Sequence, residues 1–364
     1  MSMNLHQFKS ADWRQIIKQN TRKTYLVIFL FLIMFLALGF LIDFIWRYNT
    51  VGVYAQNAYG QYQTIAASPG QIFQALMTFK LVPYATIISV VVAFIWVLCT
   101  FAFYNKIMLS GTQYKEILPN SSDSLSQRIY NVVEEMKLAA NMSYMPKVYL
   151  IEANYMNAFA SGYSEKSAMI AITRTLAEAL SRDELQAVMA HELTHIRHQD
   201  IKLNLFTIVL ANMLMFMVDI LFYSVLFGGS GQNRRDSRNN NGNNIMMIIF
   251  IAVMVLRFVL PLITSMMMLF LSRTREYMAD AGAVELMRDN GPMARALMKI
   301  SGSHQDPAVA QAYKQTSNER LRRASYIFDP NSAQLAGERK DSSDFFSTHP
   351  SLKKRLAAMG FKQK

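Results

Sequence analysis

Four long apolar blocks constrain the fold of this chain more than any other feature of its sequence. They are Tyr25–Ile42, Leu81–Tyr104, Leu203–Phe227 and Ile245–Leu271. About 20 consecutive apolar residues in a helix are enough to cross the hydrocarbon core of a bilayer. The composition agrees, because 52% of the 364 residues are hydrophobic and 17% are charged, whereas a soluble domain carries about 25% charged residues. The sequence predicts a mainly α membrane protein with about four transmembrane helices.

The first two blocks are predicted to span the membrane. Asp43 and Arg47 follow the first block in place of a small-residue cleavage site, so we interpret this block as a retained anchor. The third block contains Asp219, and the fourth contains Arg257 and Pro261, so these blocks could be spans or hairpins in the membrane plane. An isolated charge in hydrocarbon is costly. We predict that Asp219 and Arg257, which lie at similar depths if both blocks span, approach each other; the alternative is that each snorkels alone.

Basic residues near the first block predict the orientation of the chain. The segment 1–23 is rich in lysine and arginine, whereas residues 48–79 include no charged side chain. Cytoplasmic loops of membrane proteins carry an excess of Lys and Arg. We therefore expect a multi-pass protein of the cytoplasmic (inner) membrane, with the N-terminus and both large polar segments in the cytoplasm. The arginines at positions 234, 235 and 238, in the polar loop 228–244, run against this rule.

The charge and the cysteine content limit which partners and which cysteine-based sites are expected. The formal net charge is +12, and the single cysteine is Cys99. In a membrane protein, an excess of basic residues fits contact with anionic headgroups of the lipid bilayer. The basic residues form no run with interleaved aromatic residues, so no nucleic-acid partner is expected. One cysteine is too few for a disulfide framework or a thiolate metal cage.

The first polar segment has a recognisable local pattern. β-Branched residues bounded by turn residues predict short strands at Lys147–Ile151 and Ala168–Thr173. A helix is expected to begin near Ser181, because Glu184 three residues later completes a capping box. An amphipathic helix would then run through the following apolar residues.

That helix carries His191-Glu192-Leu193-Thr194-His195, an H-E-x-x-H motif. Residues four apart share a helix face, so both imidazoles can reach one Zn²⁺ at about 2.0–2.1 Å. Glu192 points beside the metal, where it can take a proton from a bound water whose pKa zinc lowers to about 7. The motif predicts one zinc ion per chain. The competing interpretation is a charged helix with fortuitous histidines.

A third protein ligand is required. The metzincin pattern needs Gly at 198 and His at 201, but this chain has His198 and Ile201, so His198 is interpreted as a neighbour of the site or a solvent-facing residue. The stretch Ser272–Asp280 offers two carboxylates four residues apart, Glu276 and Asp280. One can bind the metal while the other orients a ligand imidazole. The alternative is a solvated acidic face paired with nearby arginines. His6 and His304 lie in unrelated sequence contexts and are expected at the surface.

This combination of motifs resembles the HtpX-type membrane-bound zinc metalloproteases, relatives of the CAAX prenyl proteases. The resemblance rests on H-E-L-T-H, on S-R-T-R-E-Y-M-A-D at 272–280, on N-A-F-A-S-G at 157–162 and on S-T-H-P-S-L-K-K-R at 347–355. It covers most of the chain after the second block, together with the anchor pair. It implies an α+β gluzincin-type metalloprotease domain with a small sheet. It further implies that His191, His195 and Glu276 bind zinc, that Glu192 is the general base, and that Asp280 lies behind the ligands.

The resemblance also assigns substrate contacts. The strand that begins with Asn157, Ala158 and Phe159 would border the cleft and pair with an extended peptide by β-augmentation. His349 would donate to the developing oxyanion; the alternative is that it only neighbours a helix N-cap. Arg355 is expected to pair with an acid near the site.

The predicted organisation follows from these assignments. It comprises a cytoplasmic N-terminal segment (1–23), transmembrane helix 1 (24–47), an extracytoplasmic loop (48–80), transmembrane helix 2 (81–104), the first half of the protease domain with the HExxH helix (105–202), transmembrane helix 3 (203–227), a polar loop (228–244), transmembrane helix 4 (245–271) and the second half of the protease domain with the third zinc ligand (272–364).

The expected function is that of a membrane-integrated zinc endopeptidase that cleaves misfolded or membrane proteins at the cytoplasmic face, in protein quality control and stress response. Both halves of the metal site adjoin apolar blocks, since His195 shortly precedes the third and Glu276 shortly follows the fourth. One rival is a CAAX-type protease, which usually has more spans and a large chamber. Another is a catalytically dead membrane scaffold, which would have no need of Glu192. The sequence leaves the physiological substrate and the oligomeric state open.

Overall fold

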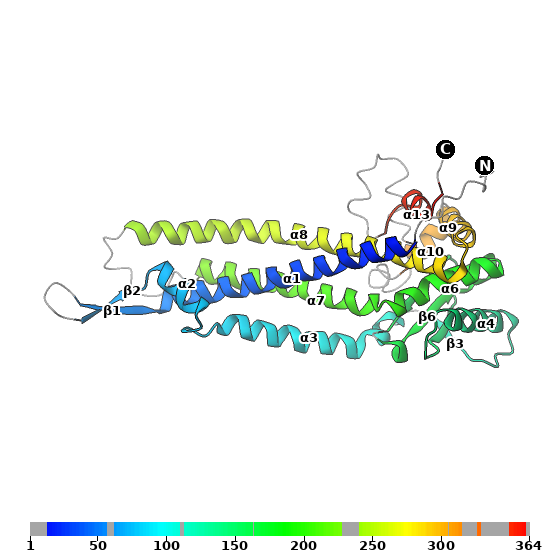
Figure 1. The fold of residues 1–364 in the computed structure, drawn as a ribbon, viewed down its shortest axis with the longest axis horizontal. Coiled ribbons are helices and arrows are strands. Elements are labelled where there is room, and N and C mark those ends of the chain that lie inside the picture. Colours follow the sequence, from blue (N-terminus) through cyan, green and yellow to red (C-terminus); the bar gives the residue numbers. More distant parts are fainter. Residues whose placement is uncertain are drawn as a thin grey trace. The chain divides into compact units, whose positions relative to one another are not determined.

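The computed structural model describes residues 13–56, 62–109, 113–162, 164–227, 240–304, 306–314, 326–328 and 349–361. These residues are mainly helical, with a two-stranded and a four-stranded sheet (Figure 1). The chain divides into two compact units. We call residues 28–99 and 207–265 the apolar-helix unit, and residues 1–27, 100–206 and 266–364 the mixed-sheet unit.

All four apolar blocks form helices: α1 (Trp13–Thr50), α3 (Tyr84–Leu109), α7 (Asp200–Phe227) and α8 (Asn240–Met287). Within the described ranges, Thr21–Tyr48 of α1 and Met247–Met287 of α8 are long and apolar enough to cross a membrane, whereas the apolar stretches Tyr84–Trp96 and Thr207–Tyr223 are shorter. The mainly helical architecture predicted from the sequence is confirmed. That all four blocks span the membrane stays a prediction.

The uncharged loop after α1 is structured. Strand β1 (Gly52–Gln56) pairs antiparallel with β2 (Tyr62–Ala66). Helix α2 (Pro69–Met77) follows, and its capping box is made by Ser68 and Gln71. The buried side chains of α2, Ile72 and Leu76, pack in a small apolar cluster with aromatic residues of α1.

Asp43 of α1 is fully buried in the apolar-helix unit, and its carboxylate is saturated with hydrogen bonds. It accepts the backbone N–H groups of Ala85 at 2.8 Å and Thr86 at 2.9 Å, and the Thr86 hydroxyl at 2.7 Å. These amides belong to the first turn of α3, where backbone donors lack helical partners and a negative charge is favoured by the helix dipole. Asp43 therefore fixes the start of α3 against α1.

The predicted approach of Asp219 and Arg257 is confirmed. Arg257 Nη2 lies 3.2 Å from Asp219 Oδ1, and the guanidinium lies over the Phe222 ring, 4.1 Å from its centroid. Within the apolar-helix unit this pair joins α7 to α8, and each charge relieves the desolvation of the other.

The mixed-sheet unit contains a four-stranded sheet in the order β3-β4-β6-β5. Its strands are β3 (Tyr114–Ile117), β4 (Lys147–Ile151), β5 (Ala158–Ser161) and β6 (Met169–Thr173). Strands β4 and β6 are parallel, and the other two pairs are antiparallel. Both predicted strands are confirmed, and β5 lies at one edge of the sheet. Gly162 ends β5 with a φ of +114°, in a turn where a Cβ would lie 2.5 Å from the Ser167 carbonyl oxygen, so the turn needs glycine.

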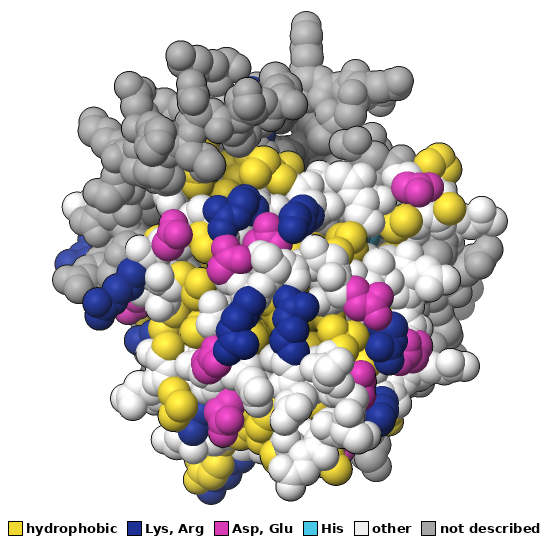
Figure 2. Space-filling model, turned by 90° about the vertical axis from the view of Figure 1, so that its right-hand side faces the viewer, with side chains coloured by type: hydrophobic (Ala, Val, Ile, Leu, Met, Phe, Trp, Pro, Cys, Tyr) yellow, Lys and Arg dark blue, Asp and Glu magenta, His cyan; other side chains and the backbone are white. Residues whose placement is uncertain are grey.

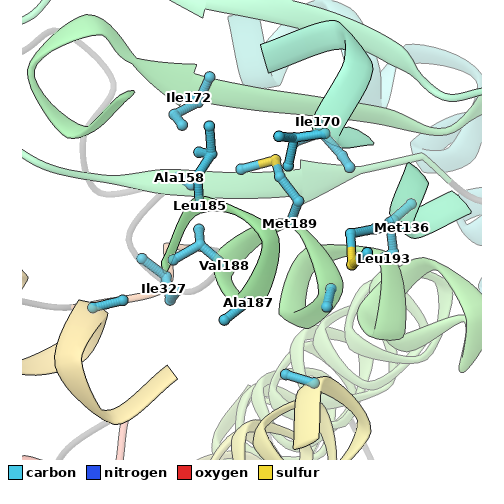
Figure 3. Packing of buried hydrophobic residues seen from close by; sticks show 14 of the residues in the cluster. Met136, Ala158, Ile170, Ile172, Leu185, Ala187, Val188, Met189, Leu193 and Ile327 are labelled. Atoms are coloured by element: carbon cyan, nitrogen blue, oxygen red, sulfur yellow. The ribbon is translucent and has the colours of Figure 1, made fainter. Parts of the chain in front are cut away.

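Helices α4 (Ser124–Ala139), α5 (Arg174–Ala179) and α6 (Arg182–Arg197) pack against this sheet. Helix α9 (Gly291–Ser303) packs on α6, and α13 (Leu352–Ala358) packs on α9. The unit also contains α10 (Pro307–Lys314) and the short 3-10 helix η1 (Glu165–Ser167). In the core, Leu185 and Met189 of α6 face Ala158, Ile170 and Ile172 of the sheet (Figure 3). Because this packing occupies the apolar face of α6, the polar residues of α6 lie on its remaining face.

Charges of both signs are interspersed on the surface drawn in Figure 2. The mixed-sheet unit contains surface ion pairs such as Arg174–Glu152 at 2.7 Å and Arg182–Glu135. On this face, the described residues therefore do not gather the +12 charge into one basic patch.

Candidate metal centre

Helix α6 brings two histidines and a glutamate into the interior of the mixed-sheet unit. The helix begins after Ser181, whose backbone N–H donates to the Glu184 carboxylate at 2.8 Å, as the capping box predicts. His191 and Glu192 are 0% and 1% exposed, and the His195 side chain is 13% exposed. The apolar face of α6 is held by the sheet, so these polar groups gather on the side that faces α8.

Helix α8 supplies buried carboxylates at Glu276 and, one turn later, at Asp280. It crosses α6 closely at Gly282, where a Cβ would lie 2.3 Å from Thr194 Cγ2 and 2.6 Å from Thr194 Oγ1. Thr194 is the residue before His195 in the H-E-x-x-H motif. Because Gly282 has no side chain, α8 can come near enough to α6 to present Glu276 to the histidines.

The three predicted ligands converge. His191 Nε2 and His195 Nε2 are 3.2 Å apart, and Glu276 places Oε2 3.7 Å from His191 Nε2 and Oε1 3.6 Å from His195 Nε2. One ligand atom from each of the three residues lies within 4.8 Å of the others. Such separations are expected between ligands that share one ion at about 2.0–2.2 Å.

The other ring nitrogen of each histidine faces a buried carboxylate. His195 Nδ1 is hydrogen-bonded to Asp200 Oδ2 at 2.8 Å, and His191 Nδ1 lies 3.1 Å from Asp280 Oδ1. A carboxylate keeps the imidazole proton on Nδ1 and leaves the Nε2 lone pair available to a metal. The two Nε2 lone pairs then face each other, and Glu276 Oε2 is buried without a hydrogen bond. A shared cation would satisfy all three atoms, so the residues present fit a metal ion.

Asp200 was not predicted from the sequence. It lies five positions after His195, a spacing that does not share a helix face, and it reaches the imidazole because the chain turns between α6 and α7. Gln199 makes this turn with a φ of 54°. Arg275 of α8 steadies it, since its Nη1 donates to the Asp200 carbonyl at 2.5 Å. The sequence signal that could have identified Asp200 is an acidic residue at the start of the helix that follows α6.

Arg355 pairs with an acid at the site, as expected. It is 1% exposed, and it donates from Nε to Asp280 Oδ2 at 2.8 Å and from Nη2 to Asp280 Oδ1 at 2.6 Å. Its Nη1 also lies 3.5 Å from Glu276 Oε2. The bidentate geometry fixes the orientation of Asp280, and the positive charge offsets the cost of burying two carboxylates.

The burial of the site shifts the pKa values of its groups. Burial raises the pKa of Glu192 to about 8, and both of its carboxylate oxygens are buried without a hydrogen bond. Burial alone would lower the pKa of His195, but the hydrogen bond with Asp200 and the charge of Glu276 outweigh it and raise the pKa to about 9. For His191, burial prevails over the attraction of Asp280 and lowers the pKa. The three groups therefore differ in how readily they hold a proton.

The structure brings His349 to the same centre. Its Nε2 donates to the Tyr326 carbonyl at 2.7 Å and lies 3.8 Å from Glu276 Oε1. Ser351, two residues later, is the N-cap residue of α13. The position of His349 is therefore compatible with both interpretations. It precedes the N-cap of α13, and its ring carries a hydrogen-bond donor beside the candidate ligands.

The outer edge of β5 is already paired where peptide binding was predicted. Asn157 is fully buried; its Oδ1 accepts the Ala158 N–H at 3.0 Å, and its Nδ2 donates to the Phe328 carbonyl at 3.1 Å. The Ala158 carbonyl accepts the Ile327 N–H at 3.0 Å, and Phe159 forms an antiparallel bridge with Tyr326. Residues 326–328 therefore occupy this part of the edge.

The remaining histidines lie apart from the ligand cluster or outside the described residues. His198 is a partly buried C-cap residue of α6 and is not among the clustered ligands. The expectation of a surface position for His304 is wrong. It is 3% exposed at the end of α9, where its Nδ1 donates to the Ile300 carbonyl at 2.8 Å and its ring packs beside Phe328. His6 lies outside the described residues.

Two imidazoles and a carboxylate that converge beside a buried glutamate define a metallopeptidase-type centre. Comparison with known proteins agrees with this class. A model of Peptidase family M48 matches residues 123–360, and a model of BlaR1 peptidase M56 matches residues 13–225, a range that ends before Glu276.

Two relatives in sequence agree with this family. The chain is 37% identical over 354 residues to a protease HtpX homolog of Helicobacter pylori, which covers 96% of this chain and 98% of the relative. It is 30% identical over 328 residues to a protease HtpX homolog of Bacteroides fragilis, which covers 90% of this chain and 93% of the relative. The crystal structure of S. mikatae Ste24p aligns with a TM-score of 0.48 at 20% identity, over 75% of this chain and 58% of that one.

The chain belongs to peptidase family M48, and its HtpX-type resemblance is confirmed. It is therefore a metallopeptidase whose substrates are proteins or peptides, and it carries helices apolar enough to associate with a membrane. The matched family range includes all the clustered ligands and Arg355.

Proposed function

We propose that this protein is a membrane-integrated zinc endopeptidase that cleaves misfolded or membrane proteins at the cytoplasmic face of the inner membrane, in protein quality control. The observation that carries the proposal is the pair of Nε2 atoms of His191 and His195, which face each other at 3.2 Å beside Glu276. Each imidazole has a carboxylate behind it, which is the usual support of a zinc-binding histidine.

The donor set favours zinc, with one ion per chain. Two imidazole nitrogens and one carboxylate oxygen form the His₂Glu set of catalytic zinc sites, which leave a fourth position for water or substrate. In this assignment His191, His195 and Glu276 are the ligands. Asp280 and Asp200 orient the imidazoles, and Arg355 holds Asp280 in place.

Glu192 is assigned as the general base. A zinc ion bound at this centre would polarise the scissile carbonyl and lower the pKa of a water ligand to about 7. Glu192 follows His191 in α6, is buried and makes no hydrogen bond, so its carboxylate is available to take the proton from the attacking water. It can then deliver that proton to the leaving amine. His349 is assigned as a donor to the oxyanion.

Chain continuity supports a membrane substrate. Glu276 lies in α8, a continuous helix over Asn240–Met287 that includes the fourth apolar block, and α7, which includes the third, begins at Asp200 behind His195. The basic segment 1–23 supports a cytoplasmic N-terminus. We therefore retain the predicted order of four membrane segments, with the halves 105–202 and 272–364 forming one protease domain on the cytoplasmic side.

The test is casein hydrolysis and zinc content of the detergent-purified protein, measured beside its Glu192→Gln variant. We expect the wild type to hydrolyse casein and the variant to lose activity by about 10²–10⁴-fold while it retains zinc, because Glu192 is not a ligand. Near-wild-type activity of the variant would contradict the role of Glu192. Hydrolysis of prenylated peptides with no action on casein would favour a CAAX-type protease instead.

A further inference from the structure

The backbone of Tyr326–Phe328 is held by three different side chains. The Tyr326 carbonyl accepts from His349 at 2.7 Å, the Ile327 carbonyl from Arg355 Nη1 at 2.6 Å and the Phe328 carbonyl from Asn157 at 3.1 Å. On the β5 side, the Ile327 N–H donates to the Ala158 carbonyl at 3.0 Å. These contacts are of the kind by which an edge strand and its neighbours hold an extended peptide.

Two of these side chains also border the candidate metal centre. His349 Nε2 lies 3.8 Å from Glu276 Oε1, and Arg355 Nη1 lies 3.5 Å from Glu276 Oε2. The Tyr326 and Ile327 carbonyls are therefore held by groups in direct contact with a candidate ligand. A substrate that pairs with β5 next to the metal would meet the same groups.

We propose that Tyr326–Phe328 is an internal occupant of the peptide-binding groove, which a substrate displaces when it binds. The inference rests on the proposed protease function and deepens it. An extended substrate binds antiparallel to β5, with backbone carbonyls on Arg355 and Asn157, and His349 is left for the carbonyl at which the oxyanion develops. The enzyme without substrate is held in a self-occluded state, in which these donors are satisfied by its own chain.

The side chains of the occupant identify the substrate class. Ile327 is 1% exposed and lies beside Val188 and Leu185 of α6 (Figure 3), in a pocket that fits a branched aliphatic side chain. The Tyr326 ring packs edge-on against Phe159 at 5.6 Å, and its hydroxyl lies 3.3 Å from that of Tyr155. The groove therefore favours an extended peptide with an aromatic residue followed by a branched aliphatic one.

When the substrate displaces Tyr326–Phe328, it makes contacts of the same kind as those that the segment gives up. Strand β5 is held in the sheet by β6 over four residues, from Ala158 to Ser161. The displaced segment is joined to β5 by one bridge, from Tyr326 to Phe159. Removal of Ile327 opens an apolar pocket, and an aliphatic substrate side chain refills it. The exchange therefore keeps both the apolar burial and the carbonyl hydrogen bonds.

The first test is kinetic and uses the full-length zinc-loaded protein with a fluorogenic peptide containing Tyr-Ile. Ile327→Pro removes the N–H that donates to Ala158 and weakens the occupant. We expect KM to fall by about threefold or more with little change in kcat, because a larger fraction of molecules is competent to bind. Ile327→Val keeps the N–H and the aliphatic side chain, and it should leave KM unchanged. A rise in KM for Ile327→Pro, with zinc content intact, would identify the segment as part of the groove wall.

The second test follows amide hydrogen exchange on addition of a peptidyl hydroxamate that contains Tyr-Ile. We expect exchange to slow in β5 and to accelerate at Ile327, since the inhibitor takes the place of the segment. Slower exchange at both places would overturn the proposal but leave the protease function intact. If the hydroxamate fails to bind the zinc-loaded protein, the proposed function itself is wrong, and the inference with it.

Discussion

The two units of the molecule differ in how far their carboxylates are paired. In the apolar-helix unit, the Asp43 carboxylate accepts three hydrogen bonds, and Asp219 is paired with Arg257. In the mixed-sheet unit, both oxygens of Glu192 and one of Glu276 are buried without a hydrogen bond. Among the described residues, the mixed-sheet unit thus leaves oxygens of Glu192 and Glu276 without a hydrogen bond although it pairs Asp280 with Arg355. Asp43 and Asp219 of the apolar-helix unit both have partners.

This difference indicates which carboxylates take part in the reaction. A buried carboxylate without donors costs free energy, so it persists where a bound ion or a reacting group supplies the missing interaction. A carboxylate that already has its donors stabilises the fold. We therefore assign Asp43 and Asp219 to the assembly of helices, and Glu192 and Glu276 to the reaction. The predictions below test this division, from the largest expected effect to the smallest.

Loss of His349 should affect catalysis more than binding. We expect His349→Ala to lower kcat by about 10²–10³-fold, as removal of an oxyanion donor does, with a smaller change in KM. Steady-state kinetics on a peptide substrate, with zinc content measured in parallel, separates the two parameters. An unchanged kcat would return His349 to the role of a residue that merely precedes the cap of α13.

The carboxylates behind the histidines should control metal affinity. We expect Asp200→Asn and Asp280→Asn each to weaken zinc binding by about 10–100-fold, the usual cost of removing such a partner. Asp43→Asn is the matched control from the other unit and should leave zinc affinity unchanged. Competition with a zinc-binding indicator measures all three. Equal affinities across the set would mean that the carboxylates behind the histidines do not support metal binding.

Asp43 should matter for stability alone. Asp43→Ala leaves the amides of Ala85 and Thr86 without their acceptor, and an unsatisfied buried donor costs about 1–3 kcal/mol. We expect a lower melting temperature in detergent, with zinc content per folded chain unchanged. If Asp43→Ala lost zinc but kept its full thermal stability, the assignment of Asp43 to the assembly of helices would be wrong.

The ion pair between α7 and α8 should show the smallest effect. Asp219→Asn and Arg257→Gln each leave one charge without its partner, so the double variant should be less destabilised than the sum of the singles. We expect a coupling free energy of about 0.5–2 kcal/mol in a double-mutant cycle on thermal stability. A coupling of zero would mean that the two charges are solvated separately.

The local structure of the site could be predicted from the sequence because its signals are local. β-Branched runs were enough to identify β4 and β6 with their boundaries to within a residue, and one capping box identified the start of α6. Residue types four apart on two helices indicated the two histidines and the pair Glu276 and Asp280, and the family resemblance selected Glu276 as the third ligand. Arg355 and His349 came from the family resemblance, because nothing in their local sequence ties them to α8.

The remaining features depend on tertiary contacts. The role of Asp200 depends on a turn at Gln199 between two helices, and the close approach of α8 depends on the absence of a side chain at Gly282. The pairing of Tyr326 with β5 joins residues far apart in the chain. His304 carried no sequence signal for burial, since only packing beside Phe328 removes it from solvent. Such contacts leave no periodic pattern from which they could be predicted.

The central claim is that His191, His195 and Glu276 bind one zinc ion. It is tested most directly by elemental analysis of purified wild type, Glu276→Ala and Glu285→Ala. Glu285 is the matched control, because it lies in the same helix and its only ion pair among the described residues is a surface contact with Arg197. We expect about one zinc per chain in the wild type and in Glu285→Ala, and a large loss in Glu276→Ala, since three protein ligands are the minimum of such sites. Equal zinc content in Glu276→Ala and Glu285→Ala would contradict the assignment of the third ligand.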